Sequence, residues 1–209
     1  MKKLKTAEKY SDDLTAIDDI YMASNQIRNV IKEIKQNYIS STKIKDIFYN
    51  IYQILDFWTG CTYIGHKKSN ELTKAFNQFY NNLLELLLIL KNMNYKCYFV
   101  NALYQGPVYR VLGHGDSSEK QNFIEPVYNN VFVSWSKNKN IPTPNMLQKL
   151  YGPITLVEGY IENNSYGIDL TIFNVSKDKE DEIIFPMRKE IVKNIEYINR
   201  NGENDDSSN

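Results

Sequence analysis

The stretch Val131–Ser136, VFVSWS, combines β-branched and aromatic residues with two serines at its carboxyl end. Residues of these types favour a β-strand. Successive side chains of a strand point to opposite faces, so Ser134 and Ser136 are expected on one face with Phe132, and Trp135 on the other. By themselves, the two hydroxyls fit either a site at the end of a strand or the solvated end of an ordinary strand.

Two other short segments give this strand a context. Upstream, Gly106–Gly113 (GPVYRVLG) reads as an apolar strand with Arg110 at its centre. Downstream, Lys179–Pro186 (KEDEIIFP) places Glu180 and Glu182 two positions apart at the entrance to a third apolar strand. Each signal is weak when taken alone, but the three occur in a fixed order along the chain.

As an ordered series, these segments resemble the arginine–serine–glutamate class of ADP-ribosyltransferases. That family shows Tyr-Arg or Trp-Arg on a first strand, Ser-Thr-Ser on a second, and Glu-x-Glu followed by an apolar strand and Pro. The matching segments here are Tyr109-Arg110, Ser134-Trp135-Ser136 and Glu180-Asp181-Glu182-Ile183-Ile184-Phe185-Pro186. The resemblance covers about the second half of the chain. The sequence departs from the family where Val111 replaces the usual Gly and Trp135 replaces the Thr.

The resemblance implies that NAD is the substrate and that ADP-ribose is transferred to arginine on a target protein. Cleavage of the bond between nicotinamide and ribose has a transition state like the oxocarbenium ion of glycoside cleavage. A carboxylate that bonds a ribose hydroxyl strengthens its contact as positive charge develops on the sugar. By resemblance this carboxylate is Glu182, and Glu180 orients the attacking guanidinium or accepts its proton.

The resemblance also implies roles for the remaining candidates. Arg110 is expected to offer its fork of donors to the cofactor pyrophosphate, which a lysine would hold less specifically. Ser134 is expected to bond both the ribose and Glu182. Tyr109 and Ser136 complete the residues expected at the cofactor, and Ser136 is also expected to support the turn that ends the strand.

His114 offers a rival interpretation, because His-Gly after a strand also begins the signature of the histidine–tyrosine–glutamate branch of the same fold. In that branch a tyrosine would stand where this chain has Phe132. Two other functions stay open: a binding protein on this scaffold that has lost catalysis, which Val111 favours, and an NAD glycohydrolase without an acceptor.

Composition limits the other classes of function. The 209 residues include 42% hydrophobic ones, and Lys+Arg and Asp+Glu are equal at 25 each, so nucleic-acid binding is not expected. The longest apolar run, Leu83–Leu90, contains Glu85 and is too short to span a bilayer. No secretory signal follows Met1, and only two cysteines are present, so we expect a cytoplasmic protein. No metal site is expected, because the two histidines and two cysteines do not cluster.

The order of apolar positions predicts the fold class. Apolar residues at helical spacing predict helices at about Asp12–Tyr38, Thr42–Trp58 and Asn70–Met93, with Gly60 ending the second. After Asn94 the pattern changes to short strands. Strands are expected around 95–99, 108–112, 154–161, 168–173 and 182–185, a short helix at 143–150, and a strand or short helix at 190–198.

We therefore predict an α+β fold: a helical N-terminal half followed by a mixed, mostly antiparallel β-sandwich of ADP-ribosyltransferase type. The expected regions are a helical segment at 1–94, a catalytic region at 95–200 and a disordered tail at 201–209. Size and order are similar to those of small bacteriophage transferases that modify host proteins, which implies action in a host cytoplasm.

Overall fold

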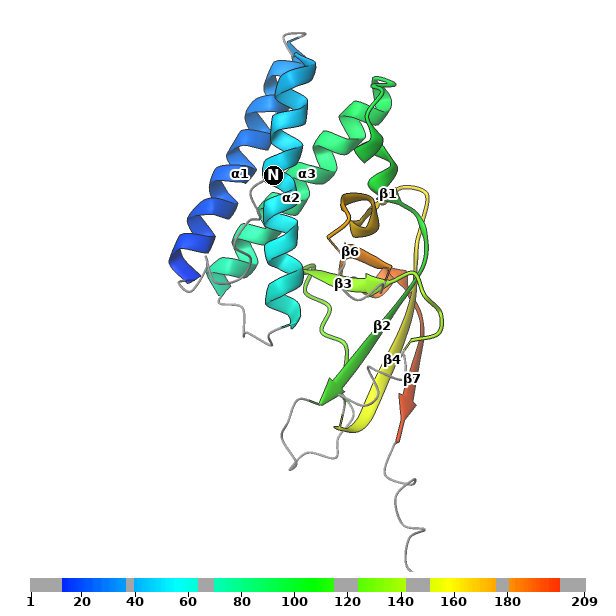
Figure 1. Cartoon of the computed structure of the whole chain (residues 1–209). Helices are drawn as coiled ribbons and strands as arrows, with labels where there is room; N and C mark the ends of the chain where they lie inside the picture. Colours follow the sequence, from blue (N-terminus) through cyan, green and yellow to red (C-terminus); the bar gives the residue numbers. More distant parts are fainter. Residues whose placement is uncertain are drawn as a thin grey trace, which may run out of the picture. The chain divides into compact units, whose positions relative to one another are not determined.

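A computed structural model describes residues 13–36, 40–63, 70–114, 124–141, 151–175 and 181–199 (Figure 1). The chain forms two compact units. The first, here called the helical unit, comprises Met1–Leu103 and Ile168–Lys179. The second, the strand unit, comprises Tyr104–Gly167 and Glu180–Asn209. The predicted helix at 143–150 and the predicted tail at 201–209 lie outside the described residues.

Three long helices dominate the helical unit: α1 (Asp13–Lys35), α2 (Ser41–Tyr63) and α3 (Asn70–Asn92). All three were predicted, but α2 does not end at Gly60. A single glycine lowers helix stability by only about 1 kcal/mol relative to alanine, so it does not by itself terminate a helix. Among the described residues, no helix combines the length and the apolar character needed to cross a membrane.

Each helix of this unit contributes a stripe of buried apolar side chains to the core. Leu83, Leu86, Leu87 and Leu90 of α3 are buried, as predicted for this apolar run. Aromatic rings add to the packing between helices, because the Trp58 ring of α2 lies edge-on to the Tyr80 ring of α3 with the ring centroids 5.1 Å apart.

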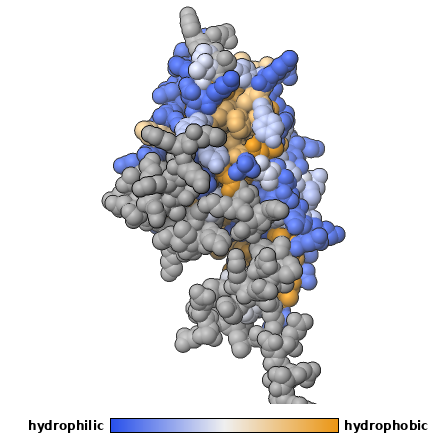
Figure 2. Space-filling model, viewed as in Figure 1, coloured by the Kyte–Doolittle hydropathy of each residue, from blue (hydrophilic) through white to orange (hydrophobic). Residues whose placement is uncertain are grey.

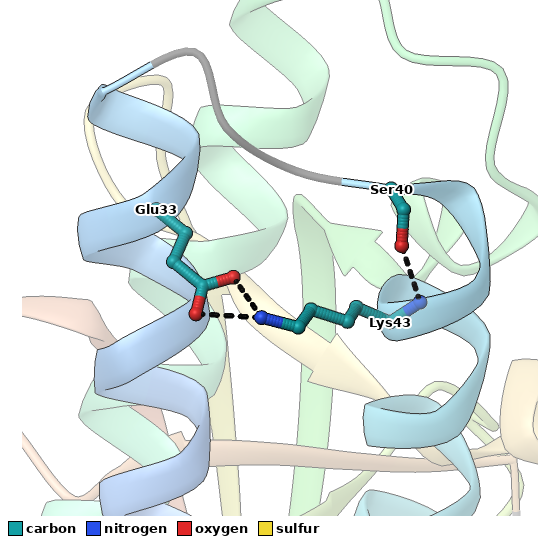
Figure 3. Close-up of polar contacts among 3 residues, drawn as sticks. All are labelled: Glu33, Ser40 and Lys43. Carbon is teal, nitrogen blue, oxygen red and sulfur yellow. Dashed lines mark hydrogen bonds and ion pairs between the residues drawn. The ribbon is translucent and has the colours of Figure 1, made fainter.

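The connection from α1 to α2 is marked by surface polar contacts (Figure 3). Lys43 Nζ lies 2.8 Å from both carboxylate oxygens of Glu33. The backbone N–H of Lys43 donates to Ser40 Oγ over 3.3 Å, which places Ser40 as the cap of α2. The Lys43 side chain is 57% exposed, so this ion pair contributes little to stability.

The end of α3 explains why the strand predicted around 95–99 is wrong. Asn94 adopts a left-handed conformation (φ 50°), and the N–H groups of Asn94 and Tyr95 donate to the carbonyls of Lys91 and Leu90. The chain then forms a short 3-10 helix, η2 (Tyr98–Ala102). In place of the predicted strand, this segment therefore forms a 3-10 helix, and its aromatic rings pack within the helical unit.

A second prediction in this unit is only partly correct. The segment predicted as a strand at 168–173 begins in β5 (Gly167–Asp169) but continues as the 3-10 helix η3 (Leu170–Phe173). The Asp169 carboxylate accepts a hydrogen bond of 3.0 Å from the Thr171 N–H, which caps η3. The Phe173 ring stacks on the Phe99 ring of η2 at 5.2 Å between centroids.

The strands confirm the predicted α+β class. They are β1 (Leu103–Tyr104), β2 (Gly106–His114), β3 (Phe132–Ser136), β4 (Tyr151–Ile161), β5, β6 (Glu182–Pro186) and β7 (Val192–Ile198), and a 3-10 helix, η4 (Lys189–Ile191), precedes β7. The order in the sheet is β1-β5-β6-β3-β2-β4-β7. The described pairings among β2, β3, β4, β6 and β7 are antiparallel.

The sequence predicted a sandwich, whereas the structure joins the strands in one curled sheet. Within the strand unit, β3 and β6 run across the direction of β2, β4 and β7 (Figure 1). The described register between β2 and β3 consists of one pair, Tyr109 with Ser136. The sheet therefore changes direction at this pair, and the two groups of strands are connected there.

One face of this sheet holds the apolar core of the strand unit. The buried members of this core are Val108, Trp135, Val157, Ile161, Ile183, Phe185, Met187 and Ile191.

Elsewhere, apolar side chains remain at the surface, which is usual for a folded chain. Figure 2 shows hydrophilic residues bordering a band of apolar ones on the face that it draws. In the helical unit, Met22, Tyr49, Met93 and Tyr98 are exposed.

Candidate active site

Three neighbouring strands bring together residues that are far apart in the sequence. Ser136 at the end of β3 lies opposite Glu182 of β6 and opposite Tyr109 of β2. Residues opposite each other in adjacent strands point to the same face of the sheet. The predicted tyrosine, serine and glutamate positions therefore share one face at the point where the sheet changes direction.

A short hydrogen bond connects the serine and the glutamate. Ser134 Oγ donates to Glu182 Oε1 over 2.5 Å. The two residues are diagonal neighbours, because Ser134 lies opposite Ile184, two positions beyond Glu182. Glu182 is only 8% exposed, and a hydroxyl that donates to a carboxylate in a largely dry environment makes a strong, orienting bond. Ser134 thus fixes the position of the Glu182 carboxylate.

Arg110 reaches the same place from the other face of the sheet. By strand alternation it starts on the face of Val108, yet its Nη1 donates to the backbone carbonyl of Ser134. The one described register pair between β2 and β3 is Tyr109 with Ser136. Ser134 lies two residues before this pair, so the Arg110 guanidinium bonds β3 at a position where β2 and β3 are not paired in the described register. Arg110 Nε is buried and has no hydrogen-bond partner among the described residues.

The charge state of Arg110 depends on two opposing effects. Burial lowers the pKa of Arg110 from its ordinary value to about 10, and the negative charge of Glu182 opposes that decrease. The guanidinium therefore stays charged at neutral pH. The site accordingly combines a buried carboxylate, a hydroxyl bonded to it and a buried cation whose field acts on the same carboxylate.

The residues that flank Ser134 behave as the alternation predicted. Trp135 is 2% exposed, belongs to the apolar core and donates from Nε1 to the Phe185 carbonyl over 3.2 Å. Its ring therefore lies on the face opposite to the serines. Ser136 Oγ accepts a hydrogen bond of 2.9 Å from the Asn138 N–H, which confirms the predicted support of the turn after β3.

The entrance to β6 contains a contact that the sequence did not reveal. Asp181 has a left-handed backbone (φ 47°), and its carbonyl accepts a hydrogen bond of 3.0 Å from the Lys137 N–H. This bond ties the residue before Glu182 to the residue after Ser136. No periodicity or motif marks such a backbone contact. Glu180 lies outside the described residues, so its predicted place beside Glu182 stays a prediction.

His114 is the last residue of β2, and its side chain lies outside what the structure describes. Phe132, which stands where the histidine–tyrosine–glutamate branch has a tyrosine, is buried at 4% exposure. Within the described ranges, no group of three or more His, Cys, Asp or Glu side chains is arranged to hold a metal ion.

Comparison with models of known families, with curated proteins and with solved structures finds no match for this chain.

Proposed function

We propose that this protein is a mono-ADP-ribosyltransferase that uses NAD to modify arginine on a target protein. The observation that carries the proposal is the 2.5 Å hydrogen bond from Ser134 Oγ to Glu182 Oε1, with Arg110 bonded to the Ser134 carbonyl. The arginine–serine–glutamate motif predicts these three residues as one set. Their convergence supports that set as a functional unit.

In the proposed reaction, Glu182 accepts a hydrogen bond from a hydroxyl of the nicotinamide ribose. This contact strengthens as positive charge develops on the sugar, so it favours cleavage more than binding. Ser134 uses its single proton on Glu182, which holds the carboxylate ready, and its oxygen can still accept a bond from the ribose. Arg110 fixes Ser134 through the main chain and balances the carboxylate charge.

The rest of the proposal depends on the sequence. Glu180 orients the acceptor guanidinium, and the curled sheet with its preceding helices is of ADP-ribosyltransferase type. The protein acts in the cytoplasm, as bacteriophage transferases that modify host proteins would.

Incubation with NAD labelled in the adenosine half and with cell lysate tests this proposal. We expect labelled protein whose label is attached to arginine, together with release of nicotinamide. Glu182→Gln should abolish both signals, whereas Glu190→Gln, which removes an exposed carboxylate of the same unit, should retain them.

Other results would reject the proposal in distinct ways. Nicotinamide release with free ADP-ribose and no labelled protein would identify an NAD glycohydrolase. No release, together with no heat of NAD binding in calorimetry, would identify a binding protein without the cofactor site.

A further inference from the structure

The face that carries the candidate site continues across the sheet as a row of aligned residues. Glu182 of β6 lies opposite Ser136, Ser136 opposite Tyr109, and Tyr109 opposite Glu158 of β4. Asn194 of β7 lies opposite Glu158. Because register partners share a face, Glu158 lies on the same face as Glu182, just beyond the residues expected at the cofactor.

Glu158 has properties that favour the binding of a positively charged group from another molecule. It is half-buried, and it has no hydrogen bond or ion pair with any described residue. Tyr109 beside it is also half-buried, and no cation from the described residues lies over its ring. A partly dehydrated carboxylate beside an aromatic face attracts a positively charged group through charge and through the ring quadrupole.

A second carboxylate strengthens this field. Glu196 of β7 lies opposite Leu156, which is two positions from Glu158 along β4, so both carboxylates are on one face. Two described lysines of the strand unit have contacts with other residues. Lys193 Nζ pairs with Glu162 at 2.8 Å, and Lys137 Nζ lies 5.9 Å from the centroid of the Tyr104 ring.

We propose that Glu158, supported by Glu196, binds a basic side chain of the target protein that neighbours the modified arginine. This inference rests on the proposed function. The target of that reaction carries a cationic acceptor, and an acidic, aromatic surface beside the site is complementary to a basic segment. The same carboxylates repel the pyrophosphate of NAD, so they suit the protein substrate and not the cofactor.

The geometry specifies where the second basic residue should be. Glu158 and Glu182 are three strand steps apart, which is roughly 14 Å in a flat sheet and less in a curled one. An extended peptide advances by about 3.3 Å per residue, so the basic residue should stand about three or four positions from the acceptor arginine.

Synthetic peptides with one arginine test this specificity. One peptide carries a lysine four positions from the arginine, a second carries alanine there, and N-acetylarginine amide serves as an acceptor without neighbours. For the wild type we expect a lower KM for the lysine peptide than for the alanine peptide. Glu158→Gln should raise the KM for the lysine peptide about fivefold, which is the scale of one partly exposed ion pair. The double substitution with Glu196→Gln should raise it further.

Three readouts should not change in these variants: the KM for NAD, the kcat for N-acetylarginine amide and the KM for the alanine peptide. Glu190→Gln should leave all values at the wild-type level. An unchanged KM for the lysine peptide overturns the inference, and so does an increase in the KM for NAD, which would assign Glu158 to the cofactor.

Different results would overturn the basic-segment inference and the proposed function. A wild type that modifies N-acetylarginine amide but does not prefer the lysine peptide overturns only the basic-segment inference. A wild type that releases no nicotinamide and modifies neither peptide nor amide overturns the proposed function, and the inference with it.

Discussion

The two units of this protein use buried polar groups differently. In the helical unit, Ser24 Oγ accepts from Asn82 Nδ2 over 2.8 Å and Thr59 Oγ1 donates to the Asp56 carbonyl over 2.9 Å, so neutral groups join or complete helices. In the strand unit, the Glu182 carboxylate of β6 and the Arg110 guanidinium of β2 lie in largely dehydrated places on the two strands that flank β3. Burial of opposite charges seldom improves stability over apolar packing, which is why such a pair indicates function.

The largest expected effect is a loss of stability, and it follows a substitution in the helical unit. Leu83 is fully buried in α3, so Leu83→Ala should lower the free energy of unfolding by about 2–5 kcal/mol through lost transfer energy and a cavity. Urea denaturation measures this, with exposed Met22→Ala as the control that should change it by less than about 0.5 kcal/mol. Nicotinamide release per folded molecule should not change. A change in that rate would mean that the two units do not divide stability and chemistry as we infer.

For the buried carboxylate of Glu182 we expect the opposite, a loss of activity in a protein that is still folded. Glu182→Gln keeps the shape of the side chain but removes its charge, so nicotinamide release should fall on the order of 100-fold. Steady-state release with NAD measures this loss, and circular dichroism checks the fold. Glu190→Gln is the matched control. Release within threefold of the wild type would remove Glu182 from the site.

Arg110 should show a smaller effect that separates its two roles. Arg110→Met removes the donor to the Ser134 carbonyl and the cation near Glu182, so nicotinamide release should fall about tenfold or more. The free energy of unfolding should change by less than about 2 kcal/mol, because burial of the charge already opposes folding. Arg110→Lys should give an intermediate rate, since it keeps a charge without the planar fork. A large loss of stability with normal activity in the folded fraction would make Arg110 purely structural.

The smallest effect is expected at the helix connection. Lys43→Met breaks the ion pair with Glu33, and the exposure of both side chains limits the change in unfolding free energy to less than about 1 kcal/mol. A urea titration at low and high salt measures it. A loss above 2 kcal/mol would show that surface charge contributes to the helical unit as strongly as its core does.

Patterns that belong to one element were predictable from the sequence. The apolar spacing of α1, α2 and α3 and the alternation in β3 depend on local side-chain periodicity, and both predictions hold. The segments at 95–99 and 168–173 were predicted as strands because they are apolar and aromatic. In the structure Tyr98–Ala102 and Leu170–Phe173 are 3-10 helices instead, and the rings of Phe99 and Phe173 stack on each other. The sequence of neither segment reveals that it contacts the other.

For the candidate site too, the sequence predicted some features and not others. The motif predicted Arg110, Ser134 and Glu182 as one set, and the alternation of β3 predicted that Trp135 lies on the face opposite to the serines. Sequence could not show that Arg110 bonds the Ser134 carbonyl, because this contact depends on where β2 and β3 separate. The bond from the Lys137 N–H to the Asp181 carbonyl could not be predicted either, because every residue type except proline has the same backbone donor and acceptor.

We propose that Ser134 and Glu182 act on NAD as one unit. A double-mutant cycle of nicotinamide release tests it most directly, with wild type, Ser134→Ala, Glu182→Gln and the double variant. Ser165→Ala, at a half-buried serine of the same unit outside the candidate site, is the matched serine control. We predict that Ser134→Ala alone reduces the rate about tenfold, and that it adds almost nothing once Glu182 is replaced, because Ser134 acts through that carboxylate. Losses that multiply independently, or a wild type that releases no nicotinamide, would contradict the claim.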